Sequence, residues 1–318
     1  MKPELLLAID LAPRSRALLE AAYVVHPAIT PQAREAVAQE HGARIRAIVT
    51  NGTTILPAAL IESLPQLGII CAQGVGYEGI DLAAARARGI VVTHGPGTNA
   101  SSVADHAMAL LLAALRDLPR NDAMVRAGRW RDGKTMRPMA TGRRLGLLGL
   151  GQIGALIARR AAGFDMPVAY HTRSPRPDSG LTYVPTLLAL AAWADILVVA
   201  VPGGASTRHM VNAEVLAALG PEGFLVNIGR GSVVDTTALV AALHTGGLAG
   251  AALDVIDGEP EVPQELRDLT NVVLTPHMAG RSPEAMLATI TLVLSNLEAY
   301  FAGRPVLTPV PEATGPQG

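Results

Sequence analysis

Three side chains in the second half of the chain have the types needed for acid–base and carboxylate chemistry: Arg230, Glu259 and His277. Each of them follows an apolar run. Arg230 stands between two glycines, and its planar guanidinium suits a carboxylate with an adjacent carbonyl oxygen. Glu259 and His277 follow successive runs, so adjacent parallel strands would bring them together as an acid–base pair. The spacing alone is also compatible with a structural arginine paired with an acid and with a structural histidine.

A glycine-rich turn precedes these residues. The stretch Gly149-Leu150-Gly151-Gln152-Ile153-Gly154 follows the apolar run 145–148 and opens a helical pattern. Gly149 permits a tight turn, Gly151 lets a pyrophosphate approach the backbone, and Gly154 lets the helix pack against the strand. The first N–H groups of that helix would face the phosphates. The pattern favours a dinucleotide site over a glycine-rich turn that binds nothing.

The next apolar run, 168–171, is followed by Thr172, Arg173 and Ser174. An acidic residue here would accept hydrogen bonds from the adenosine ribose, but no Asp or Glu occurs before Asp178. At about 4 Å and an effective dielectric constant near ~20, a unit charge pair is worth about 4 kcal/mol, so a carboxylate would repel a 2′-phosphate. An arginine would attract it. We therefore expect NADP(H) to be preferred, with NAD(H) as the second cofactor; a solvated basic loop is the alternative.

Three acids follow the run 250–253: Asp254, Asp257 and Glu259. A solvated turn or a metal-binding loop would also have this composition. A hard-cation site would need more oxygen ligands nearby, so we expect no metal here.

Positioning these residues requires a large scaffold. A chain of 318 residues exceeds one ordinary core, so about two domains are expected. Its 49% hydrophobic and 17% charged residues suit buried α/β domains, and 3% aromatic residues imply an aliphatic core. The net charge of −1 gives no pull toward nucleic acid or a membrane, so neither is expected as a partner.

Two further features are the apolar run near the amino terminus and the single cysteine. The amino-terminal apolar run 5–9 is too short for a signal-peptide core or a membrane span, so a cytoplasmic location is expected. The single cysteine, Cys71, lies in the apolar run 67–72. A buried strand thiol is therefore expected rather than a nucleophile.

Short apolar runs alternate with helical patterns, which predicts parallel sheets. The expected strands are 5–9, 22–25, 47–49, 67–72, 90–93, 145–148, 168–171, 196–200, 224–227, 250–253 and 272–274. The expected helices are 31–41, 57–63, 82–88, 103–118, 152–163, 186–194, 213–219, 236–245 and 283–301. Ser101 or Ser102 should cap the long apolar helix 103–118, which should be buried. The polar segment 116–144 should leave the compact domain as an oligomer arm.

In their order, these stretches resemble the D-isomer-specific 2-hydroxyacid dehydrogenase family, and the likeness extends from residues 74–81 to the last helix. Arg230, Glu259 and His277 match the family's catalytic arginine, glutamate and histidine. Within the family, the NADPH-dependent glyoxylate/hydroxypyruvate and hydroxyphenylpyruvate reductases look most similar, through residues 172–174, 257–263 and 296–301. The resemblance implies an α/β fold of two Rossmann-like domains, one flavodoxin-like for the substrate and one that binds the dinucleotide.

The resemblance also implies a domain plan and a reaction. A discontinuous substrate domain, 1–98 and 284–318, would enclose an NAD(P)-binding domain, 99–283. The chain would form a homodimer through the cofactor domain and the arm, with Trp130 reaching the neighbouring subunit's site. Hydride would pass to glyoxylate, hydroxypyruvate or a related 2-keto acid. His277 would donate the proton, Glu259 would orient His277, and Arg230 would bind the substrate carboxylate.

Further contacts come from the same resemblance. Backbone N–H groups of Val75 and Gly76 would hold the substrate carboxylate. Asp254 would contact the nicotinamide carboxamide, and Val103 would lie beside the ring. The remaining cofactor contacts are expected at Gly149, Gly151, Gln152, Ile153, Gly154, Thr172, Arg173, Ser174, Val201, Pro202, Thr207, Ile228 and Gly229.

Two alternatives belong to other classes. A transcriptional corepressor family shares this fold and site, so a nucleotide-sensing corepressor or scaffold is one alternative. The chain shows no long interaction tail, and all three catalytic residue types are present. A methyltransferase that uses S-adenosylmethionine is the other, and it leaves Arg230, Glu259 and His277 unexplained.

Overall fold

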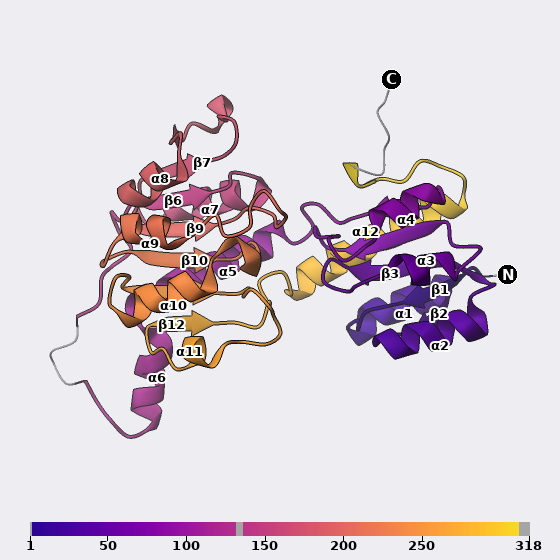
Figure 1. Cartoon of the computed structure of the whole chain (residues 1–318), viewed down its shortest axis with the longest axis horizontal. Coiled ribbons are helices and arrows are strands. Elements are labelled where there is room, and N and C mark those ends of the chain that lie inside the picture. Colours follow the sequence, from indigo (N-terminus) through magenta and orange to yellow (C-terminus); the bar gives the residue numbers. More distant parts are fainter. Residues whose placement is uncertain (1, 132–135, 312–318) are drawn as a thin grey trace. The chain divides into compact units, whose positions relative to one another are not determined.

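The chain forms two compact units in the computed structural model, which describes residues 2–131 and 136–311. The described residues of 1–99 and 282–318 form the first unit, and those of 100–281 form the second (Figure 1). Each unit is built on one parallel sheet, which confirms the predicted α/β class. Among the described residues we find no helix with the length and apolar character of a membrane span.

The first unit contains a five-stranded parallel sheet in the order β2-β1-β3-β4-β5. Its strands are β1 (Glu4–Leu7), β2 (Val24–Pro27), β3 (Ile45–Asn51), β4 (Ile69–Gln73) and β5 (Val91–Thr93). The helices are α1 (Pro13–Ala22), α2 (Pro31–His41), α3 (Ala58–Glu62), α4 (Leu82–Ala87) and α12 (Pro283–Phe301). This order is that of the flavodoxin-like open sheet.

Alternating side chains of this sheet enter two separate cores. Leu5 and Leu7 pack with residues of α1 and α12, whereas Leu6 packs with residues of α2, α3 and α4. Cys71 is buried on the α1–α12 side, as predicted. Burial raises the pKa of its thiol to about 12, so the thiol stays protonated and is a poor nucleophile.

The second unit contains a seven-stranded parallel sheet in the order β12-β11-β10-β9-β6-β7-β8. Its strands are β6 (Leu145–Leu148), β7 (Val168–His171), β8 (Thr182–Tyr183), β9 (Ile196–Val199), β10 (Phe224–Asn227), β11 (Gly250–Leu253) and β12 (Val272–Leu274). The helices are α5 (Ala100–Arg116), α6 (Leu118–Arg126), α7 (Gln152–Ala162), α8 (Leu187–Trp193), α9 (Ala213–Leu219), α10 (Thr236–His244) and α11 (Gln264–Arg267). The core on one face includes α5 and α7, and the core on the other includes α8, α9 and α10 (Figure 1).

For most strands of the second sheet, the first and last residues predicted from the sequence match those of the structure. The predicted strands 145–148, 168–171, 224–227, 250–253 and 272–274 have the bounds found in the structure. Four of the α-helices and strands were missed: α1, α6, the four-residue α11 and the two-residue β8. Helix α1 buries only Ser15 and Leu19, and α6 buries no residue, so neither presents an apolar stripe. The predicted cap at Ser101 or Ser102 was wrong, because α5 begins at Ala100 and both serines lie in its first turn.

The glycine-rich turn between β6 and α7 is shaped by close backbone contacts. Gly149 has φ +101°, and a Cβ there would lie 2.7 Å from the carbonyl oxygen of Ala200. A Cβ at Gly154 would lie 2.3 Å from the carbonyl oxygen of Gly149, so the first turn of α7 rests directly on the loop. A Cβ at Gly151 would have no described atom within 4 Å. Gly149 and Gly154 therefore serve packing, whereas Gly151 borders open space.

This difference predicts that two alanine substitutions have unequal effects on the free energy of unfolding. Gly154→Ala forces α7 away from the loop and should lower the free energy of unfolding by about 1–3 kcal/mol. Gly151→Ala, whose φ of −82° suits alanine, should change it by less than about 1 kcal/mol. Urea unfolding of both variants, followed by circular dichroism, makes the comparison. Equal stability of the two would contradict the packing role of Gly154.

Candidate active site

Most of the predicted site residues lie in loops, or in the first turn of α7, at one edge of the second sheet. Because its strands are all parallel, their carboxyl ends share that edge, where open α/β sheets bind ligands near the point at which the strand order reverses. That point falls between β6 and β9. The residues are Gly149, Gly151, Gln152, Ile153 and Gly154 after β6; Thr172, Arg173 and Ser174 after β7; Val201, Pro202 and Thr207 after β9; Ile228, Gly229 and Arg230 after β10; Asp254 and Glu259 after β11; and His277 after β12.

Glu259 and His277 are hydrogen-bonded to each other. Nδ1 of His277 lies 2.5 Å from Oε1 of Glu259, and Oε2 of Glu259 accepts from the backbone N–H of Ile256 at 3.2 Å. Since a carboxylate only accepts, Nδ1 carries the hydrogen. Nε2 is then the ring atom that can exchange a proton with another molecule.

The charge state of Glu259 follows from its surroundings. Burial alone would raise its pKa, but the hydrogen bond and charge of His277, the N–H of Ile256 and the charge of Arg230 act in the opposite direction. The pKa of Glu259 is therefore below its usual value, and the side chain is negative at neutral pH. A negative Glu259 fixes the Nδ1–H form and the orientation of the ring.

Arg230 is held on the loop after β10. Its Nη1 donates to the carbonyl of Gly229 at 2.8 Å, and its own carbonyl accepts from Nδ2 of Asn227 at 3.0 Å. Gly203 makes room for its side chain, since a Cβ there would lie 3.1 Å from Cγ of Arg230, and a Cβ at the neighbouring Gly231 would lie 2.0 Å from the carbonyl carbon of Ile256. This packing brings the loops after β10 and β11 together.

Asp254 has a role that was not expected from the sequence. Its side chain is buried, and Oδ1 accepts from the hydroxyl of Thr275 at 2.6 Å and from the N–H of Met278 at 2.8 Å. Oδ2 accepts from the N–H of Ala279 at 2.9 Å. The carbonyl of Asp254 accepts from the N–H of His277 at 2.8 Å. Asp254 therefore braces the loop that carries His277.

The loops after β6, β9 and β10 form a cradle that fits a dinucleotide. No side chain among the described residues caps α7, and the space beside its N-cap residue Gly151 is open, so its first N–H groups can bind phosphate oxygens. A Cβ at Gly149 or Gly229 would lie 2.9 Å or less from atoms of Val201. Thr207 donates to the carbonyl of Pro202 at 2.9 Å, which closes the loop after β9. Val103 and Ile228 are both buried in the core on the α5–α7 face.

The loop after β7 presents Arg173 to solvent. Its neighbours are ordered by a hydrogen bond from the hydroxyl of Thr172 to the carbonyl of Ser174, at 2.6 Å. Arg173 itself is exposed and has no hydrogen bond or ion pair with the residues that the structure describes. Its guanidinium is therefore available to an anion.

Val75 and Gly76 lie in the first unit, in the loop after β4. The carbonyl of Val75 accepts from Nδ1 of His94 at 3.0 Å. A Cβ at Gly52 would lie 2.7 Å from the carbonyl carbon of Gly76, so the two backbones pack closely. The ring of Tyr77 packs edge-on against that of His94, with centroids 5.3 Å apart. These contacts fix the loop while Val75 stays exposed.

A histidine cluster elsewhere in the first unit has metal-ligand residue types. Among the described residues, ligand atoms of Glu4, His26 and His41 lie within 4.8 Å of one another. Glu4 is bonded to His26 and Arg44, each at 2.8 Å, and Arg44 also lies 3.0 Å from Nδ1 of His41. Each of the three residues already has a bond within the cluster or to Arg44, and the charge of Arg44 opposes a cation.

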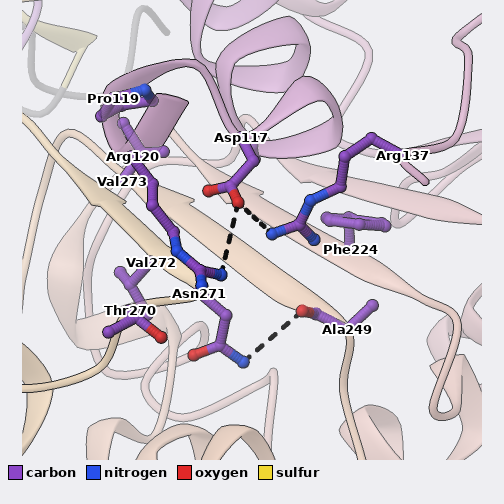
Figure 2. A pocket seen from close by; sticks show the side chains of 11 residues that line it. Asp117, Pro119, Arg120, Arg137, Phe224, Ala249, Thr270, Asn271, Val272 and Val273 are labelled. Carbon is purple, nitrogen blue, oxygen red and sulfur yellow. Dashed lines mark hydrogen bonds and ion pairs between the residues drawn. The ribbon is translucent and has the colours of Figure 1, made fainter. Parts of the chain in front are cut away.

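A separate hollow lies at the opposite edge of the second sheet (Figure 2). Phe224 and Val272 line it from the amino ends of β10 and β12. Asp117 lies between Arg120 and Arg137 and is ion-paired with both (Figure 2). Since ligands of open α/β sheets bind at the carboxyl ends, this hollow is distinct from the candidate active site.

Comparison with known proteins agrees with this arrangement. Residues 108–279 match the family model described as D-isomer specific 2-hydroxyacid dehydrogenase, NAD binding domain. The hydroxyphenylpyruvate reductase of Plectranthus scutellarioides is 45% identical over 267 residues, which cover 84% of this chain and 85% of that protein. The 2-ketogluconate reductase of Gluconobacter oxydans is 39% identical over 310 residues, 97% and 99% of the two chains. A crystal structure of an NADPH-dependent glyoxylate/hydroxypyruvate reductase from Sinorhizobium meliloti, with NADP and malonate, has a TM-score of 0.87, 42% identity and 98% coverage of both chains.

Proposed function

The chain belongs to the D-isomer-specific 2-hydroxyacid dehydrogenase family and is an NAD(P)-dependent oxidoreductase, and we propose that it reduces glyoxylate, hydroxypyruvate or a related 2-keto acid, with NADPH preferred. The observation that carries the proposal is the Glu259–His277 hydrogen bond at the carboxyl edge of the second sheet, with the charge of Arg230 nearby. The names of the relatives support this substrate class.

Each of the three residues has one task in this proposal. His277 gives a proton from Nε2 to the carbonyl oxygen, and Glu259 keeps the ring in the required orientation. Arg230 binds the substrate carboxylate and stabilises the negative charge that develops on the carbonyl oxygen. A bound nicotinamide dinucleotide supplies the hydride for the carbonyl carbon.

The cofactor contacts follow from the cradle. We assign the phosphates to the N-terminus of α7, and the adenosine and phosphate side to Val201, Pro202 and Thr207, with Ile228 and Gly229 nearby. Val103 and Asp254 take the nicotinamide end. A carboxylate oxygen accepts about two hydrogen bonds, so Oδ2 of Asp254, which accepts one from Ala279, keeps a second acceptor position that we assign to the carboxamide.

We assign the first unit to the substrate and the second to the cofactor. The exposed loop at Val75 and Gly76 supports this assignment, because two successive backbone N–H groups suit a carboxylate. The preference for NADPH is supported by the exposed guanidinium of Arg173. An NADPH preference in turn favours reduction as the direction in the cell.

We also propose a homodimer formed through the second unit. The segment around α6 exposes several large apolar side chains, among them Leu118, Val125, Trp130 and Met139, and Trp130 is 76% exposed. Exposed apolar groups of this kind mark interaction surfaces, and Trp130 would reach the neighbouring subunit's site.

Sedimentation velocity at micromolar concentration should give the mass of a dimer, and a monomer would contradict this proposal.

Replacing His277 tests the reaction. His277→Ala should lower kcat with hydroxypyruvate and NADPH by about 10²–10⁴-fold, the usual contribution of a general acid. His244→Ala, at the exposed end of α10, is the matched control and should leave kcat unchanged. Turnover of His277→Ala at the wild-type rate would refute the role of His277.

Absence of turnover in the wild type with all 2-keto acids, despite cofactor binding, would favour the corepressor or scaffold alternative.

Replacing Arg173 tests the cofactor preference. Arg173→Asp turns attraction of the 2′-phosphate into repulsion, so the ratio of kcat/KM for NADPH to that for NADH should fall by at least about tenfold. Arg267→Asp makes the same charge change on α11 and should leave the ratio unaltered. An unchanged ratio in Arg173→Asp would show that Arg173 does not contact the phosphate.

A further inference from the structure

One face of α5 holds the loop that carries His277 at both ends. At the start of the loop, Nε2 of His106 lies 3.0 Å from Oγ1 of Thr275. At its end, the hydroxyl of Ser102 donates to the carbonyl of Ala279 at 2.7 Å. Ser102 and His106 are one helical turn apart and so lie on the same face.

The direction of the His106 bond follows from the single hydrogen of the Thr275 hydroxyl. That hydrogen is donated to Oδ1 of Asp254 at 2.6 Å. Toward His106 the hydroxyl oxygen can only accept, so Nε2 of His106 carries a hydrogen. The same Nε2 lies 3.4 Å from Oδ1 of Asp254. His106 therefore donates to the network that surrounds the buried carboxylate.

The network reaches both sides of His277. Asp254 accepts from Thr275 before it and from the N–H groups of Met278 and Ala279 after it. His277 has φ +55°, a left-handed conformation that residues other than glycine rarely adopt. Such a conformation persists only when the surrounding structure holds it.

We propose that His106, together with Ser102, is a positioning residue for the reaction. Its Nε2–H donor holds Thr275 and Asp254 in place, and these hold His277 at the angle needed for proton transfer. This inference rests on the proposed role of His277 as the acid. Ser102 and His106 are polar side chains on an otherwise largely apolar helix, and neither takes a direct part in the proposed reaction. The inference gives both of them a function.

Two variants of His106 separate the hydrogen bond from mere packing. His106→Leu removes the donor, and kcat with hydroxypyruvate and NADPH should fall by about 10–100-fold, because small misplacements of a reacting group have effects of that size. The KM for NADPH should change by a smaller factor than kcat, because the loop after β6, to which we assign the phosphates, is untouched. His106→Gln restores an N–H donor at similar reach and should recover most of kcat. Ser102→Ala should lower kcat in the same direction.

Amide hydrogen exchange gives a readout that needs no activity. In the protein without added cofactor, exchange at Met278 and Ala279 should be at least about tenfold faster in His106→Leu than in the wild type. Exchange in β9 should not change, and His244→Leu should leave all of these rates unaltered. His106→Gln should return the two amides toward the wild-type rates.

The outcomes distinguish this inference from the proposed function. If the wild type is active and His106→Leu and Ser102→Ala retain both turnover and amide protection, the positioning role is wrong and the proposed function stands. Failure of His106→Gln to restore kcat would also overturn it. If the wild type reduces none of the 2-keto acids while His106→Leu still accelerates exchange at the two amides, the loop contact is supported and the proposed function fails.

Discussion

The candidate site depends on the buried carboxylate of Asp254, which is 2% exposed. An ionised carboxylate buried without partners is unfavourable by several kcal/mol. Here Thr275, Met278 and Ala279 donate to it, and all three belong to the loop around His277. The charge is therefore satisfied only when this loop has its observed conformation. The left-handed backbone of His277 is held by the same donors, so the position of His277 follows from the burial of Asp254.

Close backbone packing then brings the charged side chains within range of one another. Gly231 leaves no space for a side chain beside Ile256, and Gly203 borders the side chain of Arg230. Because the loops after β10 and β11 touch there, the charge of Arg230 lowers the pKa of Glu259. A larger residue at Gly231 would separate the loops. The glycines of this region thus set electrostatic distances as well as turns.

Much of the second unit could be predicted from its sequence because its strands are short apolar runs ended by glycine or polar residues. The central strands are buried on both faces, as parallel strands covered by helices should be. Prediction was poorer at β2, an edge strand whose partly exposed residues give no alternation. The loop sequences suggested that Glu259 and His277 could meet, since they follow neighbouring strands. They did not reveal the bracing role of Asp254 or the contact of His106 with Thr275, because the latter joins residues 169 positions apart. No local pattern encodes such a pairing.

The polar residues at the start of α5 show what this helix contributes beyond packing. Its middle is apolar and mostly buried, so polar side chains in its first two turns need a reason. Asp105 pairs with Arg160 of α7 at 2.6 Å, and Arg160 also donates to the hydroxyl of Ser101 at 2.9 Å. One end of α5 is thus bonded to the helix that follows the glycine turn and, through Ser102 and His106, to the loop of His277. Helix α7 and the His277 loop are therefore both bonded to the same helix. The position of the His277 loop relative to the start of α7 therefore depends on polar side chains of one helix, α5.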